Sequence, residues 1–342
     1  MLFVCFPNTY DFETTFDPTL TAKTTMTETT PSSAARIAHL CDSWIAAVQR
    51  PDGGMGIGGN TEQFRLLRNG ISFHDLTYEE LRAACLGLGR VLLLRGLNTV
   101  IDFDHLFFWS WCAEILLSRE SPAFTPAQRE LAELYGTSTR TALANAKRPA
   151  GSKEDFLQQR DNHRYIPFHL NEMGHHAHLI LAYLSFPLLE GVTKQACAEY
   201  VDFHGTVLRP FDAPRTGGSP RHYTVDKRCS SLRDLLHLLH AYVASPSLKS
   251  AIDEYSAHLE VLDDAMEPFD LLHSWRNSSL HGQASYPTIG GTVFNIATLI
   301  LLDRVSAQYA AVREFTWTKV QWELRSAGTQ SDRSPSSYYP PF

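Results

Sequence analysis

The chain has 342 residues, of which 44% are hydrophobic and 20% are charged, and its formal net charge is −7 at pH 7. This length is enough for two domains of ordinary size, and the composition is that of a soluble globular protein. The acidic balance argues against a general nucleic-acid coat protein, which would be basic, but not against an enzyme that binds RNA through one local basic patch.

The cysteines and the apolar runs indicate a cytoplasmic protein without a membrane partner. The six cysteines are scattered and form no Cys-x-x-Cys pair. They therefore predict neither a disulfide framework nor a zinc site, and are typical of reduced, buried thiols. No basic leader with a long apolar core begins the chain, and the apolar runs near 179–189 and 293–302 are too short to span a membrane.

The first half of the chain predicts a series of helices. Residues 1–30 are rich in Thr and Asp with weak periodicity, which predicts a disordered leader. Apolar residues at helical spacing follow, and Thr77 and Glu80 form a capping box at one helix start. The predicted helices cover residues 32–48, 77–95, 103–117 and 125–147. We expect residues 31–148 to form a helical N-terminal domain of unknown role, followed by a Pro-Gly-Ser linker.

The second half, residues 152–325, also lacks strand signals. Its predicted helices cover residues 174–201, 230–243, 247–262, 268–281 and 292–315. The sequence therefore predicts an all-α fold, in which a C-terminal bundle of four to five helices is preceded by a helical N-terminal domain. The Ser-, Pro- and Tyr-rich residues 326–342 predict a disordered tail.

One loop, residues 204–229, is locally basic. Its cations are candidates for contacts with RNA phosphates, which are made without regard to sequence. The four chosen as candidate substrate-binding residues are Arg215, Arg221, Lys227 and Arg228. The segment 226–234 also precedes a predicted helix whose free N–H groups can hold a phosphate. The alternative is a plain helix cap with solvated charges.

The most informative segment is Trp275-Arg276-Asn277-Ser278-Ser279-Leu280-His281-Gly282. Several other Arg–His pairs in the chain have similar spacing. They differ from this segment because a proline or a glycine lies between the two residues, or because the pair lies in the middle of a helix. Here Asn follows Arg directly, the pair lies on a capped helix, Gly282 stops that helix, and an apolar helix follows.

This segment resembles the HEPN superfamily motif, Arg-Asn-x-x-x-His usually followed by Gly. The resemblance covers about residues 172–315 and implies a metal-independent endoribonuclease that needs no cofactor. In that mechanism Arg276 stabilises the charge on the phosphate, His281 transfers the proton, and Asn277 or Ser278 orients the reacting groups.

The resemblance also implies a homodimer. Five residues of α-helix turn through roughly 500°, so Arg276 and His281 lie about 140° apart around the axis. In the family, two motifs meet across a two-fold axis and line one cleft. Such domains often serve as toxins or antiviral defence effectors, which implies RNA as substrate and an antitoxin or trigger ligand as partner.

Two further clusters bear on the site. In the same family an acidic or polar residue on an earlier helix faces the motif, and Glu190, in an apolar environment, needs a partner such as Arg276. The alternative is a surface glutamate. The spacing of His175, His176 and His178 does not place three ligands on one helical face, so no metal site is predicted.

Two other functions stay open. The first is a non-catalytic HEPN-like module for RNA or nucleotide binding or for dimerisation. The second is a helical scaffold in which the spacing of Arg276 and His281 is accidental. The sequence itself does not identify the RNA target.

Overall fold

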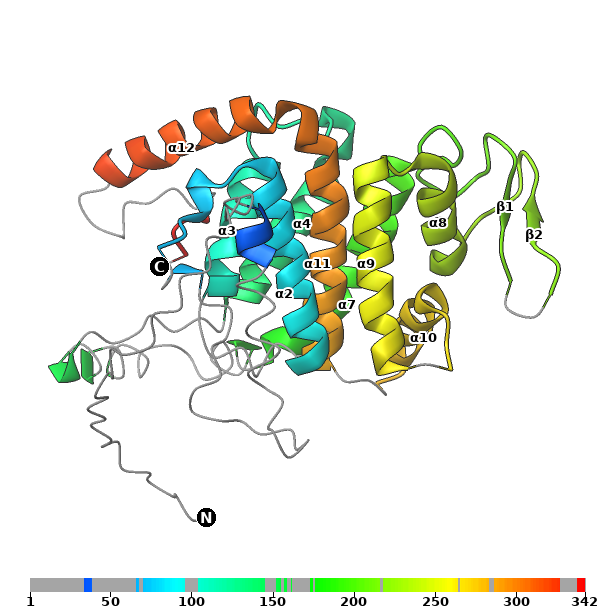
Figure 1. Cartoon of the computed structure of the whole chain (residues 1–342), viewed down its shortest axis with the longest axis horizontal. Coiled ribbons are helices and arrows are strands. Elements are labelled where there is room, and N and C mark those ends of the chain that lie inside the picture. The colour runs from blue at the N-terminus through cyan, green and yellow to red at the C-terminus, as the bar shows by residue number, and fades with distance from the viewer. Residues whose placement is uncertain are drawn as a thin grey trace, which may run out of the picture. The chain divides into compact units, whose positions relative to one another are not determined.

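Helices make up almost all the regular structure in the part of the chain that the computed structural model describes (Figure 1). The all-α fold predicted from the sequence is therefore confirmed. The predicted leader 1–30 and most of the predicted linker 148–152 lie outside this part. The described residues are 34–38, 66–67, 70–95, 104–144, 152–154, 157–158, 161, 173–174, 176–215, 218–263, 265–282, 286–326 and 337–341.

The first half contributes three long helices, α2 (Tyr78–Arg95), α3 (Asp104–Leu116) and α4 (Arg129–Leu143). Local capping starts two of these segments. The Thr77 N–H donates to Glu80 Oε2 at 2.7 Å, and the Thr125 N–H donates to Gln128 Oε1 at 2.9 Å. The second box opens a 3₁₀ turn that leads into α4. Both capping signals lie where the sequence predicts them.

The described residues of the second half contribute the long helices α7 and α9 to α12, the short helix α8 and one two-stranded antiparallel sheet. Proline is the first residue of α9 and of α10, where its missing N–H has no helical partner to lose. A π-helical turn continues α8. The elements are α7 (Ala177–Ala196), β1 (Phe211–Ala213), β2 (Arg221–Tyr223), α8 (Leu232–Leu238), α9 (Pro246–Leu262), α10 (Pro268–Leu280), α11 (Tyr286–Val305) and α12 (Tyr309–Ser326).

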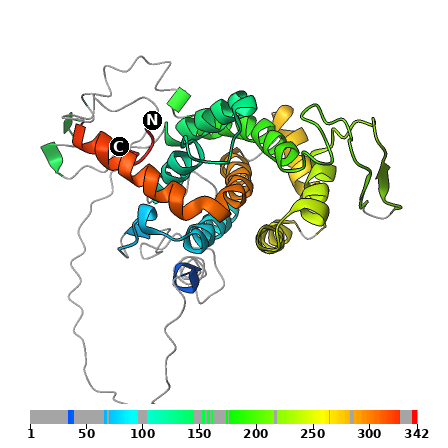
Figure 2. The ribbon, with the colours of Figure 1, turned by 90° about the horizontal axis from the view of Figure 1, so that it is seen from above.

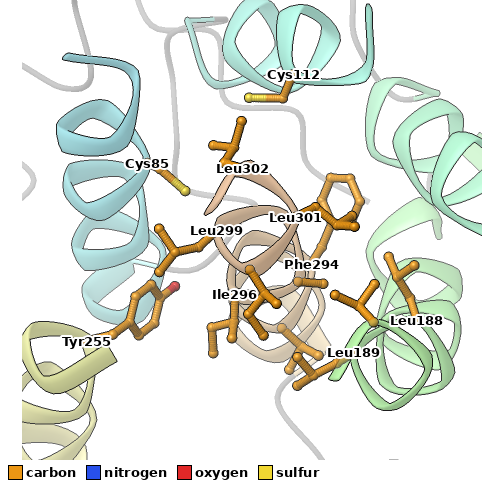
Figure 3. Packing of buried hydrophobic residues seen from close by; sticks show 14 of the residues in the cluster. Cys85, Cys112, Leu188, Leu189, Tyr255, Phe294, Ile296, Leu299, Leu301 and Leu302 are labelled. Atoms are coloured by element: carbon orange, nitrogen blue, oxygen red, sulfur yellow. The ribbon is translucent and has the colours of Figure 1, made fainter. Parts of the chain in front are cut away.

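Helix α11 is the central element of the described helices (Figures 1 and 2). It packs most extensively against α7 and α2, and it also contacts α3, α9 and α10. Figure 3 shows its apolar side chains directed at several of these neighbours, with Leu188 and Leu189 of α7 on one side and Cys85 of α2 on another. Because α11 is apolar around its whole circumference, it is buried on all sides.

Buried polar groups fix the rotation of α11. The Asn295 side chain is fully buried, donates to the Cys85 carbonyl at 2.8 Å and accepts from Trp109 Nε1 at 3.2 Å. One turn later, Thr298 Oγ1 lies 3.3 Å from the Tyr135 hydroxyl. These bonds join α11 to α2, α3 and α4 in one orientation, because rotating the helix would leave the groups buried without partners.

Helix α11 approaches α7 most closely at Gly290. A Cβ placed there would lie 2.9 Å from the Ala182 nitrogen and 2.9 Å from the His178 carbonyl oxygen, both backbone atoms of α7. Ser185 Oγ also donates to the Gly290 carbonyl at 3.2 Å. Only glycine permits this approach, so Gly290 sets the spacing of the two helices.

The hydrophobic core crosses the predicted domain boundary. Helices α2 and α3 pack on α11, and α4 packs on α7. Gly191 of α7 lies so near Leu131 of α4 that a Cβ there would come within 2.7 Å of it. The described residues of both predicted domains thus share one core, although the sequence predicts separate domains. A fragment of residues 152–325 would expose the faces of α7 and α11 that these helices cover.

The final helices differ from the prediction. The predicted helix 292–315 begins earlier, at Tyr286, and Ser306–Gln308 forms a 3₁₀ turn that separates it from α12. The pair Gly290 and Gly291 resembles a loop in sequence but lies inside α11. Their packing against α7 and α2 outweighs the low helix propensity of glycine.

The end of the predicted disordered tail packs on the helices. Tyr338 and Tyr339 are both buried, and their N–H groups donate to the buried carboxylate of Glu114 on α3. The Tyr339 hydroxyl lies 3.0 Å from His74 Nδ1, and the His74 ring stacks on Trp317 with the ring centroids 3.7 Å apart. Aromatic burial therefore orders residues that a Ser- and Pro-rich composition predicts to be disordered.

One helical segment, Thr288–Ser326, is long and apolar enough to cross a membrane by composition alone. Most of its apolar window is buried inside the protein, as in the core helix of a soluble protein. Burial by the surrounding helices thus explains its hydrophobicity.

We predict that Gly290→Ala lowers the free energy of unfolding by about 1–3 kcal/mol, because the methyl group meets backbone that cannot rotate away. Gly291→Ala is the matched control. Its methyl group would meet the flexible Leu92 side chain at 2.9 Å, so we expect a change of at most about 1 kcal/mol. Urea denaturation measures both, and equal effects would contradict the role of Gly290.

Candidate functional site

The motif lies at the end of α10, as predicted. The Glu267 side chain caps the start of the helix by accepting from the Asp270 N–H at 3.2 Å. At the other end, His281 is the C-cap and Gly282 adopts a positive φ of 73°. The Gly282 N–H donates to the Ser279 carbonyl at 3.1 Å. The left-handed glycine ends the helix directly after the histidine.

Ion pairs fix α10 against α8. Arg233 of α8 is almost buried and pairs with Asp234 at 3.1 Å and with Asp270 of α10. Its Nη1 also donates to the Pro214 carbonyl. The single guanidinium therefore joins α8, the start of α10 and the loop after β1, and it holds the motif helix in place.

Arg276 and Glu190 come together in the structure. Arg276 Nη2 lies 3.6 Å from Glu190 Oε2, and Lys194 Nζ lies 2.8 Å from Glu190 Oε1. The Arg276 side chain is 30% exposed and that of Glu190 is 21% exposed. The pairing expected from the sequence is thus present, and a second cation that the sequence analysis did not identify shares the carboxylate.

A pocket of about 260 Å³ surrounds this cluster. One face of α7 supplies six of the residues around it, at spacings of three and four that align them along the helix. Arg276 and Ser279 of α10 and Phe203 from the following loop complete the lining. The two cations share one carboxylate, so these three charged groups carry a net charge of +1. The pocket is thus suited to an anion that also has an apolar part.

Two features of the pocket lining are not explained by the packing of the helices. Ser279 is 1% exposed, and its Oγ has no hydrogen-bond partner in the described structure. Phe203 is 59% exposed although it is a large apolar side chain. A buried hydroxyl without a partner and an exposed aromatic ring in one pocket are typical of a binding site.

The remaining motif residues lie elsewhere. His281 and Asn277 are exposed and do not line the pocket, and Asn277 Nδ2 lies 3.4 Å from His273 Nε2. Ser278 is half-buried and also lies outside the pocket lining. The described structure therefore does not bring Arg276 and His281 into one cavity, in keeping with their different directions around the helix.

In the basic loop, residues 204–229, one of the four candidate cations pairs with a carboxylate and the other three are exposed. Arg221 lies 3.5 Å from the buried carboxylate of Asp234 and over the Tyr223 ring. Arg215, Lys227 and Arg228 are exposed. The short hairpin β1–β2, which the sequence analysis did not predict, carries part of this loop.

The loop is also connected to the pocket. The Val207 N–H donates to the Lys227 carbonyl at 2.8 Å, and Thr206 forms a bridge with Arg228. These bonds join the basic segment to residues 203–207, which carry Phe203 into the pocket.

The N-terminus of α8 does not offer the phosphate site considered from the sequence. Ser231 Oγ accepts from the Asp234 N–H at 3.3 Å. The Asp234 carboxylate lies buried in the first turn, where its charge opposes an incoming phosphate. The plain helix cap, which was the alternative interpretation, describes this segment.

Other catalytic chemistry finds little support among the described residues. No group of three His, Cys, Asp or Glu side chains among them is placed to hold a metal ion. His175 lies outside the described residues. Burial raises the pKa of the Cys197 thiol to about 12 and that of Cys229 to about 11, so neither is a thiolate nucleophile near neutral pH.

We predict that Glu190→Gln lowers the free energy of unfolding by about 1 kcal/mol at low salt, because Arg276 and Lys194 lose their shared counter-charge. The loss should shrink in 1 M salt, which screens the repulsion between the cations. Denaturation at both salt concentrations measures it. Glu133→Gln is the control, since its pair with Arg129 is exposed on α4. A loss of unfolding free energy in Glu190→Gln that does not depend on salt would contradict the electrostatic explanation.

The candidate site thus consists of an Arg276–Glu190–Lys194 cluster in a partly aromatic pocket and an exposed His281 at the end of the same helix. Comparisons of the chain with protein-family models, with curated proteins and with solved structures find no match.

Proposed function

We propose that this protein is a HEPN-like, metal-independent endoribonuclease that acts as a homodimer. One observation supports the proposal above all others: the Arg276 guanidinium lines a pocket and pairs with Glu190, while His281 is exposed at the end of the same helix. An oriented guanidinium and an accessible imidazole are the two groups that this reaction requires.

The proposed reaction is an internal transfer at phosphorus. The RNA 2′-oxygen attacks the adjacent phosphate, and its proton passes to a base. The bond from phosphorus to the 5′-oxygen breaks, and an acid protonates the leaving oxygen. The products are a 2′,3′-cyclic phosphate and a 5′-hydroxyl. His281 acts as the base or the acid, and Arg276 stabilises the charge that develops on the non-bridging oxygens.

Dimerisation would bring an Arg276 and a His281 close enough to act on one phosphate. Within one protomer Arg276 lines the pocket and His281 does not. An isologous interface around the end of α10 would place the exposed His281 of one protomer beside the Arg276 of the other. In this arrangement Asn277 and Ser278, at the same helix end, orient the phosphate or the imidazole.

A second candidate function is a non-catalytic module that binds RNA or a nucleotide, or that dimerises. The observation in its favour is that the pocket collects Arg276, Lys194 and Ser279 without any histidine. Binding needs only the cations and the aromatic rings, whereas cleavage also needs a group that transfers a proton.

The proposed biological role is that of a cytoplasmic toxin or defence effector. RNA is then the substrate, and an antitoxin or a trigger ligand controls the activity. The exposed cations Arg215, Lys227 and Arg228 contribute substrate affinity, and Arg221 contributes less because it pairs with Asp234.

We predict that Arg276→Ala and His281→Ala each reduce cleavage of single-stranded RNA in EDTA by at least about 100-fold. His273→Ala, on the same helix, is the matched control and should keep its activity. Circular dichroism and thermal melting check that each variant folds. A folded His281→Ala variant with full activity would disprove the catalytic assignment.

A mixture of the two inactive variants should regain activity if Arg276 and His281 act across a dimer interface. A heterodimer then has one intact composite site, so an equimolar mixture should reach about a quarter of the wild-type rate. Sedimentation velocity measures the oligomeric state of the same samples. Two dimeric, folded variants that never complement each other would place both residues of a site on one protomer.

A further inference from the structure

We propose that the pocket formed by α7, α10 and residues 203–207 holds one unpaired base of a single-stranded RNA next to a backbone phosphate. This inference rests on the proposed function for the identity of the polymer. It goes further in assigning base recognition to Tyr183, Phe203 and Ser279, and phosphate binding to Lys194.

The charged side of the pocket is suited to one phosphate. Lys194 and Arg276 both face Glu190, and a single carboxylate neutralises only one of them. The Arg276 guanidinium makes an ion pair at 3.6 Å but no hydrogen bond within the described structure. Its N–H donors therefore remain available for phosphate oxygens, which guanidinium and ammonium groups bind well.

The apolar side of the pocket is suited to a flat ring. Phe203 is 59% exposed and Tyr183 is 41% exposed, while Phe186 is buried behind them. The Tyr183 ring stacks on Tyr286 with centroids 6.0 Å apart, which limits its rotation. Any of the four bases can stack on such rings, because every base has a π-face.

Two polar groups can read the edge of that base. Ser279 Oγ is buried at the pocket without a partner. Pro187 has no N–H, so it cannot donate the usual helical hydrogen bond to the Tyr183 carbonyl. The Ser279 hydroxyl can both donate to and accept from a base edge, and Tyr183, whose carbonyl lacks that helical donor, belongs to the same pocket lining.

The surroundings of the pocket favour a polymer over a free nucleotide. From Phe203 the chain runs to the exposed Leu208 and pairs with the segment that carries Lys227 and Arg228. Gly205 fixes this pairing, since its φ is +84° and a Cβ there would lie 2.5 Å from the Cys229 carbonyl oxygen. Cations interleaved with apolar side chains outside the pocket match a continuing phosphate backbone.

The test measures binding without cleavage. Fluorescence anisotropy of the full-length protein is followed with a short 2′-O-methyl RNA and with an abasic oligomer of equal length, and 5′-mononucleotides are added as competitors. We expect the base-bearing RNA to bind about tenfold more tightly than the abasic oligomer. Phe203→Ala should abolish this difference by weakening only the base-bearing RNA. Trp322→Ala, which removes an aromatic ring exposed on α12, should change neither.

Further variants separate the two parts of the pocket. Lys194→Met should weaken both oligomers and reduce the salt dependence of binding, because it removes a phosphate contact. Ser279→Ala should alter the preference among the four bases and leave the abasic oligomer unaffected. Equal binding of both oligomers by the wild type, or a Phe203→Ala variant that still discriminates between them, would overturn the inference.

The failure of this inference is distinguishable from failure of the proposed function. Base-dependent binding without RNA cleavage in EDTA would refute the nuclease and support the pocket. Cleavage without base-dependent binding would do the opposite. Mononucleotides that compete as strongly as the oligomer would overturn the assignment to a polymer.

Discussion

The close contact between α7 and α11 at Gly290 determines where the α7 side of the candidate site lies. The glycine lets the two backbones meet, and the buried bonds of Asn295 fix the rotation of α11 around its axis. Because α7 lies directly against this central helix, its opposite face has a defined direction. That face carries Glu190 and Lys194, so a packing constraint in the core also positions the charges at the surface.

One face of α7 packs in the core, and the opposite face lines the candidate site. Leu188 and Leu189 point into the core (Figure 3), whereas residues at positions 183, 187, 190 and 194 line the pocket. Packing in the core explains the apolar face of α7. It does not explain why the opposite face carries an ion cluster beside aromatic rings. Because the charged groups of the cluster are partly exposed, their ion pairs contribute only about 1 kcal/mol or less to the free energy of unfolding. The proposed binding of a ligand would account for the charges, the rings and the buried hydroxyl of Ser279 together.

Local signals in the sequence were sufficient for most of the helices, whereas the Arg276–Glu190 pair was expected from the family resemblance and the apolar surroundings of Glu190, with a surface glutamate as the alternative. The capping box at Thr77, Pro268 as the first residue of α10 and the stop at Gly282 act within a few residues and could be read directly. The pocket could not be predicted in full, because Lys194, Phe203 and Ser279 become neighbours only through tertiary packing. The start of α11 was predicted too late, at residue 292, for the same reason, since the role of Gly290 depends on a backbone more than 100 residues away.

The different positions of Arg276 and His281 have a consequence for how activity can be controlled. An arginine held in its own pocket and a histidine exposed at the helix end form one site only when a second surface joins them. In the proposed homodimer, the monomer would bind RNA but would lack the complete set of reacting groups. Under the proposed function, assembly would control catalysis by mass action, because the fraction of dimer rises with concentration. If the proposed nuclease acts as a homodimer, a partner that covers the end of α10 would block its assembly without entering the pocket, which is how the proposed antitoxin or trigger would act.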